Sequence, residues 1–231
     1  YLKRPYVLIP NLAESMPTVS DDGFSYTFKL KKGVMFHDDK SFEGGKGREM
    51  TADDVIYSFM RIGDPKLQST GWWVMDGKIK GLNEWREAMM EKDKVDYRAK
   101  LEGVEKVDKY TVKFTLKKPF PQFLYAFAMS FFKVVPREAV EFYGKEFVNH
   151  PVGTGPFTLK KYDRTKTITY LRNKKYRDDF FPTEGSDEDK KAGLLAAAGK
   201  KIPFVDKIVS HIITESQPRW LNFLKGKVGL L

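Results

Sequence analysis

The sequence predicts an α+β fold, or an irregular α/β fold, in which mixed sheets are flanked by helices. Stretches that alternate apolar and polar residues predict strands, and a stretch with an apolar stripe near period 3.6 predicts a helix. Strands and helices do not alternate regularly along the chain, which argues against a parallel βαβ sheet. With 231 residues, 41% of them hydrophobic and 14% aromatic, the chain has enough apolar side chains for a packed core.

The first predicted strand covers residues 24–30 and follows a turn signal at residues 21–23. Its apolar residues fall on one side and its polar residues on the other. A short return strand is expected at residues 34–36. Residues 37–49 are polar and rich in glycine, which predicts a surface loop with His37 exposed.

The clearest helix begins at Thr51, a residue that caps free helix amides. Asp53 and Asp54 lie in the first turn, where acids favour the positive end of the helix dipole, so capping explains them better than acid–base catalysis. An apolar stripe with helical spacing follows, made of Val55, Ile56, Phe59, Met60 and Ile62.

The middle of the chain predicts a loop, a hairpin and three more helices. Trp72 and Trp73 lie in the loop, and a helical stretch follows at residues 83–92. Residues 104–116 predict a β-hairpin. A buried helix is expected within residues 120–132, and the last helix starts near Pro136 and runs to residue 143.

The net charge of +10 is concentrated in residues 160–177, which hold eight basic residues and one acid. Their alternating pattern predicts a hairpin with a solvated face, so the charges can simply coat a sheet. A nucleic-acid-binding module that uses this hairpin stays a second interpretation, although no known nucleic-acid signature accompanies it. Residues 183–201 predict an exposed excursion with a short helix, before a strand at 205–213 and a helix at 217–225.

The sequence lacks the residue patterns that catalytic, metal-binding and cofactor-binding sites need. We therefore expect no catalytic residue, no metal site and no cofactor. Cysteine is absent, which excludes disulfides and thiol catalysis. The three histidines are not spaced as metal ligands. The Gly153–Pro156 motif predicts a tight turn, because Pro156 lacks the amide that a phosphate cradle needs. No apolar run approaches the roughly 18 residues of a membrane helix.

Four residues each allow two interpretations from the sequence, a structural role and a role in ligand contact. Trp72 and Trp73 are adjacent and rarely would both be buried, so one can line a cleft and stack on a ligand, or both can pin the loop. Asn173 and Tyr176 follow the basic hairpin, where a turn role competes with ligand contact.

The order of motifs resembles family 5 of the extracellular solute-binding proteins, the oligopeptide-, dipeptide- and nickel-type receptors of ABC importers. Residues 12–38 are similar to the family's signature region and residues 50–59 to the helix that follows it. Residues 149–157 resemble the second strong motif. Residues 171–176 resemble an Arg-Asn-Pro-x-Tyr segment, with Lys174 in place of proline, and residues 208–231 resemble the next block, with Gly229 where an acid is usual.

The resemblance implies a fragment of a class II periplasmic-binding-protein-like fold, from which the second ligand lobe is missing. Residues 1–135 would form a small β-rich subdomain with helices, and residues 136–231 part of the first ligand-binding lobe. The start at Tyr1, without a methionine, and the apolar end at Leu231 are expected of a piece of a longer chain. By segment order, Trp72, Trp73, Met129, Ser130, Asn173 and Tyr176 would lie near the ligand.

The function implied by the resemblance is the substrate-binding component of an ABC transporter that captures peptides in the periplasm. An extracellular, membrane-anchored location is the alternative. The expected partners are a peptide or small-molecule ligand and the permease subunits, with no nucleic acid and with membrane contact only through the permease or a lipid anchor. A monomer is expected. A receptor for a nickel or metal chelate, or for an oligosaccharide, is the alternative within the family.

Overall fold

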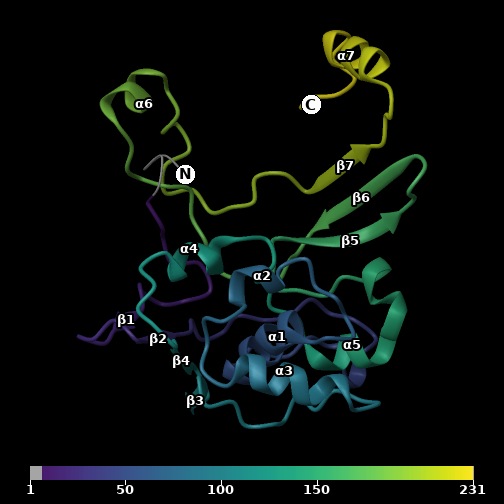
Figure 1. The fold of residues 1–231 in the computed structure, drawn as a ribbon. Coiled ribbons are helices and arrows are strands. Elements are labelled where there is room, and N and C mark those ends of the chain that lie inside the picture. Colours follow the sequence, from purple (N-terminus) through teal and green to yellow (C-terminus); the bar gives the residue numbers. More distant parts are fainter. Residues whose placement is uncertain (1–6, 231) are drawn as a thin grey trace.

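The computed structural model describes residues 7–230, which form two antiparallel sheets with flanking helices (Figure 1). The predicted mixed fold is therefore confirmed. The chain ends at which we expected a cut, Tyr1 and Leu231, lie outside the described residues. The predicted subdomain division stays a prediction, and the ion pair of Arg48 with Glu138 crosses its boundary.

The first sheet has four strands in the order β1-β2-β4-β3. Tyr26 on β2 pairs with Phe114 on β4, and both side chains are buried, as the period-two pattern predicts. The predicted return strand at 34–36 is wrong, because Met35 forms only an isolated bridge with Glu49. The strands are β1 (Thr18–Val19), β2 (Ser25–Lys29), β3 (Val104–Asp108) and β4 (Thr111–Thr115).

Five α-helices surround this sheet, and α1 packs on β3 and β4. The predicted start of α1 is confirmed: the Asp54 carboxylate accepts a hydrogen bond from the Thr51 amide at 2.8 Å. The predicted loop at Trp72–Trp73 is wrong, since both residues lie in the short helix α2. The helices are α1 (Ala52–Gly63), α2 (Trp72–Met75), α3 (Leu82–Met90), α4 (Phe123–Ala128) and α5 (Arg137–Tyr143).

The hydrophobic core lies between the first sheet and these helices. Phe114 is at its centre, with its ring 4.9 Å from that of Phe59 and 5.1 Å from that of Phe127. All the buried hydrophobic residues of the described chain lie between Tyr26 and Val152. Two 3₁₀ helices complete this part, η1 (Glu43–Gly45) and η2 (Gly144–Asn149). We call residues 7–152 the packed body.

The second sheet has the order β5-β6-β7, and no described residue after Val152 is buried. The predicted basic hairpin is confirmed as β5 (Phe157–Tyr162) and β6 (Thr167–Arg172), and β7 is Lys207–His211. In the exposed excursion lies α6 (Asp187–Lys191), and α7 (Ser216–Leu224) follows β7. We call residues 153–230 the sheet extension, which rises from the body in Figure 1.

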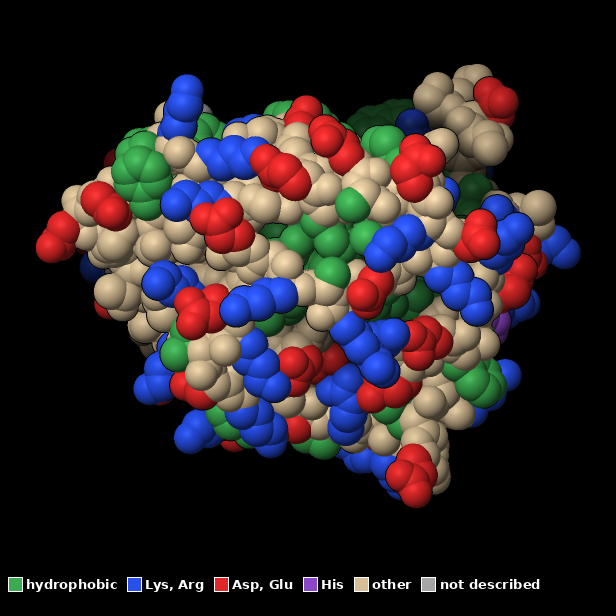
Figure 2. All heavy atoms as spheres, turned by 60° about the horizontal axis from the view of Figure 1, so that its bottom comes forward, with side chains coloured by type: hydrophobic (Ala, Val, Ile, Leu, Met, Phe, Trp, Pro, Cys, Tyr) green, Lys and Arg blue, Asp and Glu red, His purple; other side chains and the backbone are tan. Residues whose placement is uncertain are grey.

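Charge is spread over the face of the molecule that Figure 2 shows. Lysine and arginine side chains alternate there with acidic ones around a small apolar hollow. Between residues 7 and 230, no helix is both long enough and apolar enough to span a bilayer.

Candidate ligand-binding surface

The six residues expected near the ligand fall in two places. The first place is the aromatic edge, which we define as Trp73, Met129 and Ser130. Trp73 is 62% exposed and Met129 37% exposed, and Ser130 is exposed too. Trp72 instead packs against the core, with the Arg86 guanidinium 4.6 Å from its ring centre. One tryptophan of the pair is therefore available to a ligand.

The aromatic edge is held together by a close approach between Gly71 and Phe131. A Cβ atom at residue 71 would lie only 2.6 Å from Cγ of Phe131, so the helix α2 and the end of α4 can meet only where residue 71 has no side chain. This contact places the chain segment that carries Trp73 next to the segment that carries Met129, although the two are far apart in the sequence.

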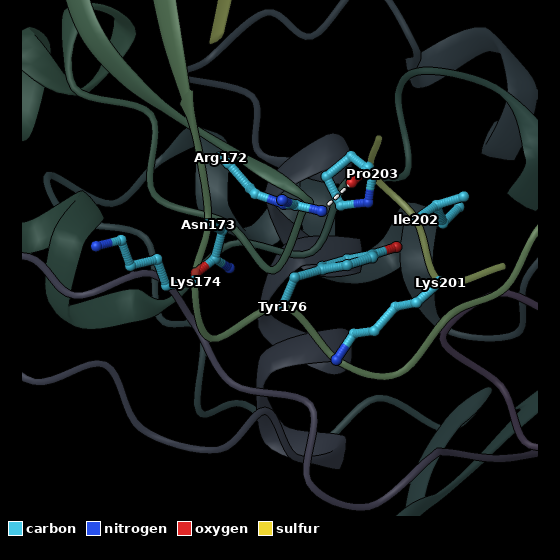
Figure 3. A pocket seen from close by; sticks show the side chains of 7 residues that line it. All are labelled: Arg172, Asn173, Lys174, Tyr176, Lys201, Ile202 and Pro203. Atoms are coloured by element: carbon cyan, nitrogen blue, oxygen red, sulfur yellow. Dashed lines mark hydrogen bonds between the residues drawn. The ribbon is translucent and has the colours of Figure 1, made fainter. Parts of the chain in front are cut away.

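The second place is a cavity of about 320 Å³ beside the end of β6. Figure 3 shows the Tyr176 ring between Pro203 and Lys201. The Tyr176 hydroxyl donates to Asp179 at 2.8 Å. Seven side chains line this cavity: Arg172, Asn173, Lys174, Tyr176, Lys201, Ile202 and Pro203.

The cavity is rich in cations, but most of them have partners. Arg172 pairs with Asp206 at 3.0 Å, and Lys201 pairs with Asp178. Within residues 7–230, Lys174 has no carboxylate within ion-pair distance. Figure 3 shows the Lys174 ammonium pointing away from the other lining side chains, so the cavity offers polar groups but not this free charge.

Asn173 has the turn role, one of the two roles that the sequence allowed. Its Nδ2 donates to the Gly155 carbonyl at 3.1 Å, and its Oδ1 accepts from the Lys175 amide at 3.0 Å. Its side chain is thus used in local structure, and it shapes the cavity rather than pointing freely into it.

His37 is buried, so the prediction of an exposed histidine is wrong. Only 8% of the residue is exposed, and it hydrogen-bonds to the turn at residues 153–156. Its Nε2 donates to the Gly155 carbonyl at 2.9 Å, and its amide donates to the Gly153 carbonyl at 2.8 Å. Burial lowers the pKa of His37, which favours the neutral ring.

One carbonyl, that of Gly155, thus accepts hydrogen bonds from both His37 and Asn173. We call these three residues the Gly155 joint. A further contact supports it, since Lys175 pairs with Asp38 at 2.7 Å. The joint connects the packed body to the sheet extension.

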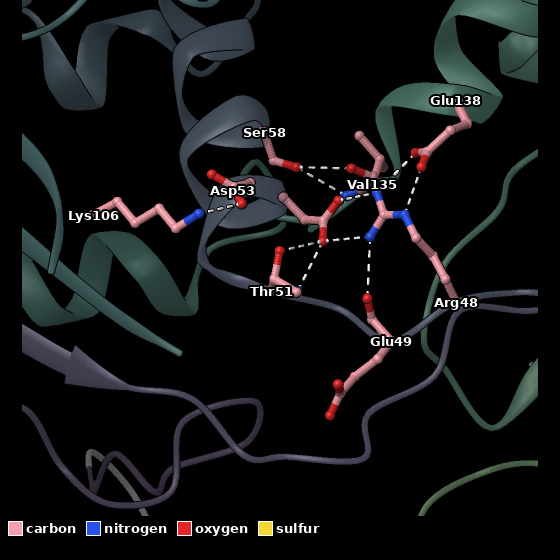
Figure 4. Close-up of polar contacts among 9 residues, drawn as sticks. Arg48, Glu49, Thr51, Asp53, Ser58, Lys106, Val135 and Glu138 are labelled. Carbon is pink, nitrogen blue, oxygen red and sulfur yellow. Dashed lines mark hydrogen bonds and ion pairs between the residues drawn. The ribbon is translucent and has the colours of Figure 1, made fainter. Parts of the chain in front are cut away.

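A second cavity, of about 690 Å³, lies along α1 and was not predicted. Its wall includes an ion network in which Arg48 pairs with Asp54 at 2.7 Å and with Glu138 at 2.5 Å (Figure 4). This pairing raises the pKa of Arg48 and lowers that of Glu138. Asp54 was recognisable as a capping residue, but no local signal marks Arg48, which lies outside the helix.

The described residues hold no group of three or more histidine, aspartate or glutamate side chains arranged to bind a metal ion. What the two places offer is an exposed aromatic ring and hydrogen-bond donors. These groups suit reversible binding.

Solved structures define the class of protein. The chain is similar to the ABC transporter-associated periplasmic binding protein DppA from Helicobacter pylori, solved in complex with the peptide STSA, with a TM-score of 0.65 and 27% identity. The match covers 95% of this chain and 37% of that one. The fold is that of a periplasmic binding protein.

The family follows from the sequence comparison. Residues 7–231 match the bacterial extracellular solute-binding proteins, family 5, and the chain belongs to this family. The predicted resemblance is thereby confirmed.

Two curated relatives show what such proteins bind. Di/tripeptide-binding protein 2 of Pseudomonas aeruginosa is 35% identical over 73% of this chain, and Heme-binding protein A of Haemophilus influenzae is 36% identical over 72% of it. The match covers 30% and 29% of their own lengths, so the chain spans less than a third of each relative.

Proposed function

We propose that this chain is part of the substrate-binding component of an ABC importer and that it takes part in capturing small peptides outside the cytoplasm. The match to family 5 over residues 7–231 carries the proposal. Relatives named for dipeptides and tripeptides, and a solved neighbour holding a peptide, favour peptides as the ligand class. The protein would bind and release its ligand without chemistry and work as a monomer.

The structure supports a role for the aromatic edge in this capture. We propose that the second ligand lobe closes over Trp73, and that a bound peptide contributes backbone hydrogen bonds and stacks a side chain on the indole. Residues 1–135 would act as the smaller subdomain and 136–231 as part of the first lobe. Open and closed states would differ in ligand affinity, which drives capture.

Calorimetry with dialanine and trialanine tests the proposal. A longer protein that contains this chain and the second ligand lobe, here called the two-lobed protein, should bind both peptides. Residues 1–231 alone should bind them at least tenfold more weakly, because the contact surface of the second lobe would be absent. Equal affinity of the two proteins would contradict the lobed arrangement. No binding of any peptide by the two-lobed protein would contradict the ligand class.

A tryptophan series tests the aromatic edge. Trp73→Ala should weaken peptide binding about tenfold, the scale of one lost stacking contact, and leave the melting temperature nearly unchanged. Trp72→Ala should lower the melting temperature, because that ring packs on the core. Trp220→Ala is a matched control, since this ring is 50% exposed on α7. If Trp73→Ala changes only stability, the edge has no part in binding.

A heme receptor is the second candidate, because a relative of that name is equally similar. The same titrations with hemin in place of peptide decide between the two. A Soret shift on mixing, with no heat from peptides, would favour heme.

A further inference from the structure

The basic residues of the β5–β6 hairpin divide into two groups that the sequence alone does not separate. At its base, Arg172 pairs with Asp206, Lys175 with Asp38 and Arg177 with Asp179, while Lys174 is the exception that has no such partner in the described chain. At its turn, within the described chain, four cations have no carboxylate at ion-pair distance. We call them the tip cations: Lys160, Lys161, Arg164 and Lys166.

The one acid of the turn does not neutralise the tip cations. The Asp163 carboxylate accepts hydrogen bonds from the Thr165 amide at 3.0 Å and the Thr165 hydroxyl at 2.8 Å. These bonds close the turn and lower the pKa of Asp163. With four cations and one acid, the tip carries 4 − 1 = +3 over seven residues.

The geometry exposes this charge. Lys160 lies where the register between β5 and β6 shifts, so it has no partner across the hairpin, and all four tip cations are exposed. In Figure 1 the turn between β5 and β6 lies at the outer edge of the molecule. Tyr162 is 39% exposed beside them, with the Arg164 guanidinium 5.3 Å from its ring centre.

We propose that this tip docks on an anionic phospholipid surface. Arg164 donates to the Asn149 side chain at 3.0 Å, and none of the four tip cations lines either cavity described above. Exposed cations outside a pocket suit a field of phosphate groups better than one shaped ligand. An exposed tyrosine with an apolar ring and a polar end is favoured at the headgroup level. This contact is direct, unlike the contact through a permease or lipid anchor that the resemblance implies.

The inference uses the proposed function only to place the protein near a membrane. An importer works at a membrane face, and a weak electrostatic contact there would keep the receptor close to it. The contact would be lost at high salt, because the charges are exposed and are screened.

Vesicle co-sedimentation tests the proposal. The purified protein should bind vesicles of phosphatidylglycerol and phosphatidylcholine at 50 mM salt, and not vesicles of phosphatidylcholine alone. Replacing the tip cations by glutamine (K160Q, K161Q, R164Q, K166Q) should weaken binding at least tenfold. A control with the same loss of charge replaces four exposed lysines that lie elsewhere, Lys92, Lys94, Lys191 and Lys200, and should weaken binding less than threefold.

Circular dichroism and peptide titration accompany both variants. Unchanged spectra show that the fold is intact, and unchanged peptide affinity separates the tip from the ligand site. If the parent protein binds no peptide, the vesicle experiment still tests the tip cations by itself. Equal vesicle binding by the tip variant and the parent would overturn the proposal. So would binding that ignores lipid charge, or retention on double-stranded DNA without binding to vesicles.

Discussion

The packed body and the sheet extension are built from the same kinds of residues and stabilised in different ways. The body contains all the described buried hydrophobic side chains, whereas the extension contains none. In the extension, aromatic residues such as Phe204 and Trp220 are about half exposed. The extension is therefore stabilised by strand pairing and surface ion pairs, whereas the body is stabilised by burial of apolar area.

The largest expected effect tests burial directly. Phe114→Ala should lower the free energy of unfolding by about 3–5 kcal/mol, because it opens a cavity among four neighbouring rings. Phe204→Ala in the extension should cost roughly 1 kcal/mol or less, since that residue is 51% exposed. Urea denaturation measures both. Similar losses would mean that the extension also depends on a core.

An intermediate effect is expected from the ion pairs. Arg48→Met should destabilise the protein by about 3 kcal/mol, because Asp54, whose side chain is 2% exposed, would be left buried without its cation. The matched change in the extension is Arg172→Met, which breaks the pair with Asp206, a residue on the surface, and should cost at most about 1 kcal/mol. If both variants lose only about 1 kcal/mol of unfolding free energy or less, the Arg48 ion pair stabilises the body no more than a surface pair does.

The smallest expected effect is a change in acid sensitivity. Hydrogen bonds from the Gly33 amide and the Tyr110 hydroxyl lower the pKa of Glu49 to about 2. Because the folded pKa lies below the unfolded one, the stability from Glu49 is present above the unfolded pKa and is lost as pH falls from about 5 toward 2. Glu49→Gln should flatten this acid limb of the stability profile.

The matched change for this pH profile lies in the extension. The pKa of Asp163 is also lowered, but its partners belong to one exposed turn. Asp163→Asn should leave the acid limb closer to that of the parent than Glu49→Gln does. Thermal unfolding between pH 2 and 7 compares them. An unchanged profile for Glu49→Gln would contradict the assignment.

Features with a local signal were predictable from the sequence. The strand at 25–29, the helix α1 and the basic hairpin each repeat a pattern over many residues, and the structure has all three. The four-residue helix α2 is too short to show a period, so its tryptophans were placed in a loop.

Features that depend on distant partners were not predictable in the same way. His37 has a polar neighbourhood in sequence, and only the fold brings Gly155 to its ring. Arg48 likewise meets Glu138 only after α5 has packed. For the candidate site, the order of segments in the sequence predicted residues in both places. The exposure of Trp73 and the residues that line the cavity beside Tyr176 are seen only in the folded structure.

The Gly155 joint has a consequence for the timing of local opening. The amides of His37 and Asn173 both donate to the turn at residues 153–156, at 2.8 Å in each case. Their acceptors, the Gly153 and Pro156 carbonyls, lie in the same short turn as the Gly155 carbonyl that both side chains bind, so opening of this turn releases both amides. The two amide hydrogens should therefore exchange with deuterium at a common rate, as one cooperative unit formed from segments far apart in the sequence.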